Sequence, residues 1–243
     1  MDAPSDRSRP ELRQRWRLVA RRAPDAPATT QRELTEAWES AVLASGLPVA
    51  MSEAAVPRPR LAFGAPVPTG VAAEAELIDL YLTERIPIWR VREALGNRLP
   101  EGWSLVDLYD VWLAGPALPG RVAAADYRIE LAQAGPEGTP PERAALSAAA
   151  TRLLAARSLP RERAKGGGMV AYDLRPLLVD VTVDGDGPAV VVRTRTRFHP
   201  ELGTGRPEEV VAAIGDAIGH PLVPGAIVRE RLILADELGD GGR

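Results

Sequence analysis

The chain has 243 residues, of which 45% are hydrophobic and 26% charged, and its formal net charge at pH 7 is -3. This composition is typical of soluble proteins, and no apolar stretch reaches the ~20 residues of a membrane span or resembles a signal peptide, so we predict a cytoplasmic protein. The absence of cysteine excludes disulfides, a thiolate nucleophile and iron–sulfur ligation by this chain.

The first half of the chain predicts two helices among four strands, in the order β-α-β-β-α-β. The corresponding segments are residues 13–20, 30–46, 60–67, 77–82, 87–99 and 103–113. The first helix carries the clearest signals, because Thr30 and Glu33 form a capping box and Gly46 stands at the expected C-terminal position. Its apolar stripe consists of Leu34, Ala37, Trp38, Ala41 and Val42. This order of elements is that of the ferredoxin-like fold.

The same order repeats after a linker rich in glycine and proline at 114–121. The repeated segments are residues 125–131, 141–157, 177–184, 189–198, 207–218 and 226–234. Thr139 and Glu142 form a second capping box before the first of these helices. We therefore predict an α+β protein with two tandem ferredoxin-like domains, each with an antiparallel sheet. The predicted boundaries are a disordered tail at 1–12, domains at 13–113 and 122–235, and a disordered tail at 236–243.

A stiff basic segment precedes the second strand. Pro57 and Pro59 force extended backbone, and Arg58 and Arg60 alternate with them. Guanidinium groups bind phosphate or carboxylate through two parallel hydrogen bonds, so this segment is a candidate recognition surface. The alternative is a structural segment whose arginines are solvated or cap neighbouring carbonyls.

Three further basic sites lie in the second half. Residues 161–165 precede a run of glycines and predict a flexible basic loop that folds onto phosphate, or else a mobile surface loop. Asp173 and Arg175 would share a strand face and form an ion pair. Arg206 begins a helix whose free amides favour anions, with ordinary helix capping as the alternative. The candidate substrate- or RNA-binding residues are therefore Arg58, Arg60, Arg161, Arg163, Lys165, Asp173, Arg175 and Arg206.

Arginines also occupy one face of two predicted strands. They are Arg13, Arg15 and Arg17 in the first domain and Arg193, Arg195 and Arg197 in the second. Single-stranded RNA often lies across the open face of such a sheet, but aromatic residues usually provide the stacking platform, and these outward positions have none. The alternative is a solvated charged face, or one that packs against the other domain.

No reaction centre is recognisable. His199 and His220 are the two histidines, both stand beside proline or glycine, and they lack metal-ligand spacing. No serine sits in a nucleophile motif. The five tryptophans mostly fall on core-facing positions. We predict no catalytic residue, no metal and no cofactor.

Residues 13–234 resemble the radical SAM-linked family, a bacterial domain of unknown function. The resemblance is carried by Gly46-Leu47-Pro48, Ser52-Glu53, Pro57-Arg58-Pro59-Arg60-Leu61, Phe63-Gly64, Pro68, Gly70, Glu76, Asp79, Leu82, Asp173-Leu174-Arg175-Pro176 and Arg206-Pro207-Glu208-Glu209-Val210. Members usually begin the first helix with Ser-His-Leu-Asp and place an arginine one turn on. Gln31 and Glu36 stand at those positions here, so a function that rests on the family's His and Arg would be altered or lost.

The resemblance implies a non-catalytic recognition or adaptor module that works with a separately encoded radical SAM protein. Its substrate would be RNA (tRNA or rRNA) or linked to the ribosome. One alternative is a metal-independent RNA-processing enzyme, since the predicted architecture is similar to that of CRISPR repeat-processing RNases; it would require His199 or His220. The other alternative is a purely structural protein-interaction domain.

Overall fold

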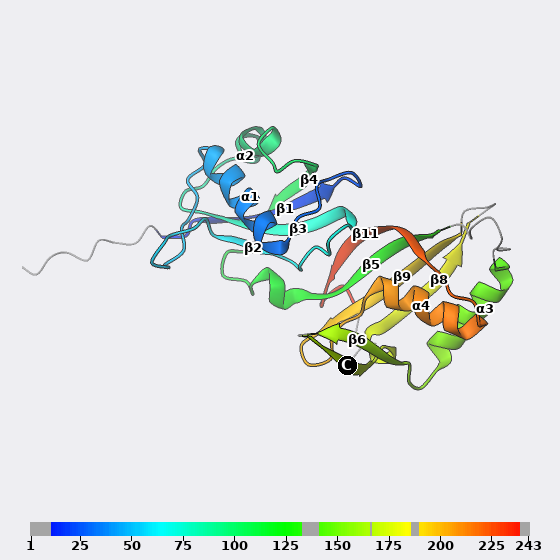
Figure 1. Ribbon diagram of the computed structural model, residues 1–243. Helices are drawn as coiled ribbons and strands as arrows, with labels where there is room; N and C mark the ends of the chain where they lie inside the picture. Colours follow the sequence, from blue (N-terminus) through cyan, green and yellow to red (C-terminus); the bar gives the residue numbers. More distant parts are fainter. Residues whose placement is uncertain (1–10, 133–140, 166, 186–189, 239–243) are drawn as a thin grey trace, which may run out of the picture. The chain divides into compact units, whose positions relative to one another are not determined.

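The computed structural model describes residues 11–132, 141–165, 167–185 and 190–238. Over these residues the protein is mixed α/β, with four α-helices and a large, mostly antiparallel sheet (Figure 1). The chain divides into two compact units. Unit 1 holds the residues up to Thr69 together with Ala75–Arg121, and unit 2 holds Gly70–Glu74 together with the residues from Val122 onward.

Unit 1 contains four strands and two α-helices. They are β1 (Gln14–Arg22), α1 (Gln31–Ala44), β2 (Leu61–Phe63), β3 (Ala72–Leu82, whose first three residues belong to unit 2), α2 (Ile88–Gly96) and β4 (Trp103–Asp110). β1 lies between β3 and β4, and β2 pairs with β3 antiparallel. A short 3₁₀ helix, Leu118–Arg121, follows β4 and buries Leu118.

One face of this sheet makes the core of unit 1. The core combines apolar positions of the strands with the inner stripes of both helices. Its largest members are Trp16, Leu18, Leu34, Trp38, Val42, Ile78, Leu80, Leu82, Val91, Leu95 and Leu108. Trp38 lies edge-on against the rings of Phe63 and Trp103. Because side chains alternate along a strand, the residues between these core positions point to the opposite face of the sheet.

Helix α1 forms as its sequence predicts. The Thr30 hydroxyl accepts a hydrogen bond from the Glu33 amide, and the Glu33 carboxylate accepts one from the Thr30 amide, so the predicted capping box is confirmed. Gly46 follows the helix with φ +70°, in the left-handed region that glycine tolerates. The predicted stripe is confirmed by the burial of Leu34, Trp38, Ala41 and Val42.

The end of unit 1 is more exposed than predicted. Helix α2 ends at Gly96, three residues before its predicted end, and Ile88 lies at the surface. β4 ends at Asp110, and only Leu108 in it is buried, because β4 pairs with β1 alone and is an edge strand. Trp89 and Trp112 are exceptions to the expectation that the tryptophans mostly face the core, because they are exposed by 64% and 77% of their surface.

Unit 2 contains seven strands and two α-helices in the described residues. They are β5 (Val122–Leu131), α3 (Arg143–Ala155), β6 (Pro160–Lys165), β7 (Gly168–Asp173), β8 (Leu178–Asp184), β9 (Val191–His199), β10 (Gly203–Thr204), α4 (Pro207–Ile218) and β11 (Pro224–Leu234). The sheet order is β10-β9-β5-β11, and β8 also pairs with β9. All of these pairs are antiparallel. Helices α3 and α4 contact each other, α3 packs against β8, and α4 packs against β9.

Three predictions for unit 2 need correction. The sheet is mixed rather than antiparallel throughout, because β11 also pairs in parallel with the start of β3, at Val228↔Ala72 and Arg229↔Ala73. The predicted basic loop is instead an antiparallel hairpin, β6–β7, which satisfies the backbone groups that a loop would leave to water. Helix α3 begins at Arg143 rather than Pro141, and its N-cap residue Glu142 makes no side-chain capping bond.

Some predictions fall outside the described residues. Thr139, the partner in the second capping box, lies there, as do most of the two tails predicted at 1–12 and 236–243. Within the second tail, the Glu237 carboxylate accepts a hydrogen bond from the Leu234 amide, so the chain forms a turn directly after β11. No helix in the described ranges is long and apolar enough to cross a membrane.

Candidate functional site

The segment Pro57–Arg60 is extended, as predicted, and pairs with residues 50–52. The Arg60 amide donates to the Ala50 carbonyl at 2.7 Å, and the Ser52 amide donates to the Arg58 carbonyl at 2.7 Å. Prolines 57 and 59 have no amide hydrogen, so in this segment only the two arginines can donate. The alternation of proline and arginine therefore fixes which backbone groups pair and leaves the arginine side chains to the surface.

The two arginines of this segment have different partners. Arg58 forms an ion pair with Glu39 of α1 at 3.5 Å. The guanidinium carbon of Arg60 lies 4.8 Å from the ring centroid of Tyr81, a cation–π contact. Among the described residues Arg60 makes no ion pair with a carboxylate, although its side chain is exposed. Arg60 is therefore the better candidate for binding an external anion.

Arg60 opens onto a hollow of about 810 Å³, the Arg60 hollow. It is lined by Leu12, Ala50, Met51, Ser52, Glu53, Pro57 and Arg60. Leu12 also lines a second hollow of about 550 Å³, the Trp112 hollow, together with Arg13, Arg85, Trp112 and their neighbours. Arg13 is paired with Glu11 at 2.9 Å, whereas Arg85 is exposed and makes no ion pair within the described ranges. The two hollows thus share Leu12, and each contains one arginine, Arg60 or Arg85, that makes no ion pair in the described residues.

A buried ionic cluster lies on the sheet face opposite the core. Arg15 and Arg17 of β1 both pair with Asp79 of β3, at 2.6 and 2.7 Å. These side chains are almost completely buried, at 2%, 2% and 0% exposure. The expectation that Arg13, Arg15 and Arg17 share an open sheet face is therefore wrong for Arg15 and Arg17, whereas Arg13, directly before β1, is exposed. Burial alone would lower the pKa of Arg17, but the hydrogen bond and charge of Asp79 outweigh it and raise that pKa.

Arg15 connects this cluster to the turn after Trp112 and to the ring of Tyr81. Its guanidinium donates to the carbonyls of Gly115 and Pro116, at 3.0 and 2.8 Å, in the turn that follows Trp112. Its guanidinium carbon also lies 5.6 Å from the ring centroid of Tyr81, the ring that Arg60 covers. One buried side chain thus supports the Trp112 turn and the aromatic ring beneath Arg60.

In unit 2, the candidate arginines gather around Tyr172. Arg163 lies 4.8 Å from the Tyr172 ring centroid, and Arg161 pairs with Asp216 of α4. Burial raises the pKa of Tyr172, and the charge of Glu209 adds to this, while Arg161, Arg163 and Arg206 act in the opposite direction. A hollow of about 400 Å³ lies beside this cluster. Glu209 and Asp216 offset its positive charge.

The remaining candidate residues of the second half are Asp173, Arg175, Arg206 and Lys165. Asp173 and Arg175 bond to the backbone. Asp173 accepts hydrogen bonds from the amides of Leu159 and Arg175, at 2.7 and 2.9 Å, rather than pairing with the Arg175 guanidinium. The guanidinium donates instead to the carbonyls of Ala156, Leu178 and Leu154, near the end of α3. The Arg206 side chain makes no capping bond to α4. Lys165 ends β6, and its side chain lies outside the described part.

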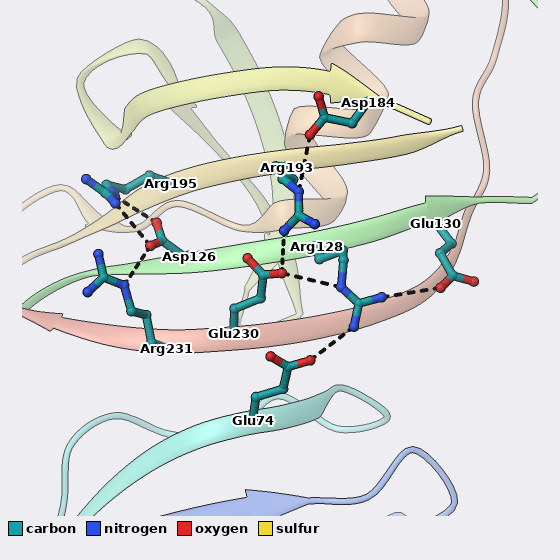
Figure 2. Close-up of polar contacts among 9 residues, drawn as sticks. All are labelled: Glu74, Asp126, Arg128, Glu130, Asp184, Arg193, Arg195, Glu230 and Arg231. Carbon is teal, nitrogen blue, oxygen red and sulfur yellow. Dashed lines mark hydrogen bonds and ion pairs between the residues drawn. The ribbon is translucent and has the colours of Figure 1, made fainter. Parts of the chain in front are cut away.

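The arginine face of β9 carries a network of ion pairs (Figure 2). Its members are Glu74, Asp126, Arg128, Glu130, Asp184, Arg193, Arg195, Glu230 and Arg231. Arg193 pairs with Glu230 and Asp184, and Arg195 pairs with Asp126 at 2.7 Å. Five carboxylates surround four guanidinium groups, so this face offers no excess positive charge to a phosphate backbone.

His199, one of the two histidines, contacts the backbone of the turn that follows it. The Nδ1 atom of His199 accepts hydrogen bonds from the amides of Glu201 and Leu202, which gives that ring a structural role in a turn. No group of three potential metal ligands occurs among the described residues. Gln31, at the position of the family's histidine, accepts a hydrogen bond from the Val67 amide at 3.2 Å.

Three residues at or near the two hollows were not predicted from the sequence: Arg85 and Trp112 line the Trp112 hollow, and Tyr81 lies beneath Arg60. One sequence feature indicated that Trp112 lies at the end of a strand: it stands just before the glycine- and proline-rich stretch at 114–121. No sequence pattern indicated Arg85 or Tyr81, because Arg85 shares a hollow with Trp112, and Tyr81 lies beneath Arg60, only in the folded protein.

Comparison with known proteins gives one family. A family model described as "Uncharacterized protein conserved in bacteria (DUF2344)" matches residues 15–206. No curated protein matches the sequence.

Three solved structures are similar to the chain. A Cbf5-Nop10-Gar1 complex has a TM-score of 0.48 and 10% identity, and the match covers 88% of this chain and 49% of that chain. An archaeal box H/ACA sRNP Nop10-Cbf5 complex has a TM-score of 0.43, 12% identity, and coverage of 87% and 47%. An H/ACA RNP bound to a substrate RNA has a TM-score of 0.43, 14% identity, and coverage of 88% and 47%. The chain thus spans about half the length of the chains it matches.

Proposed function

Because the chain belongs to the family of uncharacterized proteins conserved in bacteria (DUF2344), which carries no assigned activity, we propose from its geometry that it is a non-catalytic recognition module that binds RNA through unit 1. The observation that carries this proposal is Arg60. It is exposed, lies on the Tyr81 ring, and has no carboxylate partner among the described residues. A guanidinium held in this way is oriented for an incoming phosphate before binding occurs.

The distribution of arginines supports unit 1 over unit 2 as the binding surface. In unit 2, the arginines Arg193 and Arg195 are neutralised by carboxylates of the same face. An RNA strand crossing that face would have to displace these pairs without a gain in positive charge. In unit 1, Arg60 and Arg85 are unpaired in the described part and line hollows that share Leu12.

We also propose a domain architecture and a protein partner for the chain. We propose that residues 13–113 and 122–235 are ferredoxin-like domains, which the strand orders β4-β1-β3-β2 and β11-β5-β9-β8 support. We propose a radical SAM protein as the partner, because residues 13–234 resemble the radical SAM-linked family. In RNA binding Arg58, which is paired with Glu39, contributes less than Arg60 beside it, which is unpaired in the described residues.

The test compares RNA binding by the wild type and by Arg60→Gln. Affinity for a single-stranded uridine 12-mer is measured by fluorescence anisotropy between 50 and 200 mM salt. Loss of one phosphate contact is expected to weaken binding and to reduce the slope of log affinity against log salt by about 0.7 to 1. Arg193→Gln is the matched control, because it removes the same charge from a paired arginine.

The control is expected to keep the wild-type slope. Equal slopes for the wild type and Arg60→Gln would contradict the assignment of the Arg60 hollow. Absence of any oligomer binding by the wild type at 50 mM salt would contradict RNA recognition altogether.

A further inference from the structure

Trp112 is the most exposed large aromatic side chain in the described residues. About 77% of its surface is accessible, although burying a tryptophan is among the most favourable contributions a side chain makes to folding. Trp89 on α2 is also exposed, by 64%, but it lines neither hollow. Trp112 differs because it forms part of a hollow that also contains cationic side chains.

The backbone that carries Trp112 is firmly held. The Gly115 amide donates to the Trp112 carbonyl at 3.1 Å, which closes the turn. The carbonyls of Gly115 and Pro116 accept hydrogen bonds from the buried Arg15, which is itself anchored by Asp79. Glycine at 115 suits this turn, because a β-carbon there would lie 3.2 Å from the Trp112 carbonyl oxygen, a tight contact, while its distance of 3.5 Å from the indole ring would be ordinary. An exposed ring on a fixed turn loses little entropy when a ligand stacks on it.

The charges near Trp112 suit a nucleotide. Arg85 lines the same hollow and makes no ion pair in the described part of the chain. A planar aromatic ring next to an unpaired guanidinium is the combination with which proteins bind single strands, the ring stacking on a base and the cation binding the phosphate. The carboxylates of the hollow are already engaged, since Glu11 pairs with Arg13 and Asp110 accepts from Gln14.

From this geometry we infer that Trp112 stacks on a base of single-stranded RNA and that Arg85 binds an adjacent phosphate. This inference rests on the proposed function and adds to it a specific base contact. Leu12, which lines both hollows, places the Trp112 contact next to the phosphate contact of Arg60. The strand would therefore pass from one hollow to the other. Stacking tolerates every base, so the contact recognises a single strand rather than a sequence.

The test measures binding of the uridine 12-mer, and of the same 12-mer with abasic nucleotides, to three tryptophan variants. Trp112→Ala is expected to weaken binding of the uridine 12-mer about 5- to 100-fold, because the stacking contact is lost. Trp112→Phe is expected to retain most of the affinity. Trp89→Ala is the matched control and is expected to bind as the wild type does. The abasic oligomer keeps its phosphates but offers no base, so the wild type and Trp112→Ala should bind it equally.

The salt dependence separates this inference from the proposed function. Trp112→Ala is expected to keep the wild-type salt slope, whereas Arg85→Gln should lower it by about 0.7 to 1. If Trp112→Ala binds the uridine 12-mer as the wild type does, while Arg60→Gln is weakened, the stacking role is wrong and the proposed function stands. If no variant differs because the wild type does not bind, both are wrong.

Tryptophan fluorescence provides a second readout that does not depend on the alanine variant folding. The uridine 12-mer is expected to quench the fluorescence of the wild type and of Trp89→Ala, because the stacked base contacts Trp112. The quenching should disappear in Trp112→Phe, which preserves the aromatic packing. Equal quenching in Trp112→Phe and in the wild type would overturn the inference.

Discussion

Arg17 and Arg195 make the same kind of ion pair in different surroundings. Arg17 and Asp79 are both withdrawn from water, so their mutual attraction is strong and each depends on the other for neutralisation. Arg195 and Asp126 keep 34% and 20% of their side-chain surface exposed, so water screens their attraction. The contribution of the Arg195–Asp126 pair to the free energy of unfolding is therefore expected to change with pH while the fold stays intact.

Asp126 is expected to titrate below the ordinary aspartate range. Burial opposes its ionisation, but hydrogen bonds from Arg195 and Arg231 outweigh burial and lower the pKa of Asp126. Because the folded pKa lies below the unfolded value of about 3.9, the stabilisation is present above that value and is lost as pH falls through the folded pKa. Urea unfolding of the wild type and Asp126→Asn, followed by circular dichroism, should show a wild-type advantage at pH 6 that shrinks below about pH 3.5.

A direct measurement supplies the control for this prediction. The carboxyl carbon of Asp126, followed by NMR, should titrate at a lower pH in the wild type than in Arg195→Gln. Equal midpoints in the two proteins would show that Arg195 does not set this pKa.

At the scale of elements, Asp79 joins three segments of unit 1. It lies in β3 and pairs with Arg15 and Arg17 of β1, and Arg15 in turn holds the turn after β4. The family resemblance includes Asp79, and the structure provides a physical reason for it. Without this carboxylate, two guanidinium groups would be buried next to each other with no counter-charge.

Asp79→Asn is therefore expected to destabilise unit 1 by about 3–5 kcal/mol, the range found when one partner of a buried ion pair is removed. All five tryptophans lie in unit 1, so denaturation followed by tryptophan fluorescence reports on this unit. Glu36→Gln serves as the comparison, because the Arg32–Glu36 pair is exposed and its loss should change the free energy of unfolding by less than about 1 kcal/mol. Similar midpoints for the two variants would contradict the role assigned to the buried cluster.

At the scale of the whole molecule, the two units differ in whether their arginines are paired with carboxylates. The chain has 30 basic and 33 acidic residues, so its net charge of -3 does not by itself attract a polyanion. The sheet face of unit 2 is neutralised internally, while Arg60 and Arg85 of unit 1 remain unpaired in the described residues. Under the proposed function, RNA binding is therefore expected to be local, at the Arg60 and Trp112 hollows.

The partner prediction is tested by tagging the protein in its native host and purifying it with and without RNase. A radical SAM protein that remains bound after RNase treatment is the expected outcome for an adaptor. RNA or ribosomal proteins should co-purify only without RNase, and less with Arg60→Gln than with Arg193→Gln. A radical SAM protein that is absent from both preparations would contradict the proposed partnership.

Local signals in the sequence were sufficient for several elements. The Thr30–Glu33 capping box, the stripe from Leu34 to Val42 and the glycine after the helix define α1, and α4 spans the predicted residues 207–218. These signals work because helix caps and helical periodicity depend on residues three or four positions apart. The β6–β7 hairpin was missed because β6 is short and polar, and β7 is a short run, Gly168–Asp173, without an alternation of polar and apolar residues.

The candidate site was only partly predictable. The alternation of proline and arginine at 57–60 determined an extended basic segment, since proline constrains its own backbone and that of its neighbour. Only the tertiary structure decided that Arg58 is paired with Glu39 and that Arg60 is not. It also decided that Arg15 and Arg17 are buried, because their counter-ion, Asp79, is more than 60 residues away in the sequence. Whether a charged side chain meets water or a partner depends on contacts between distant segments, and no local pattern encodes those contacts.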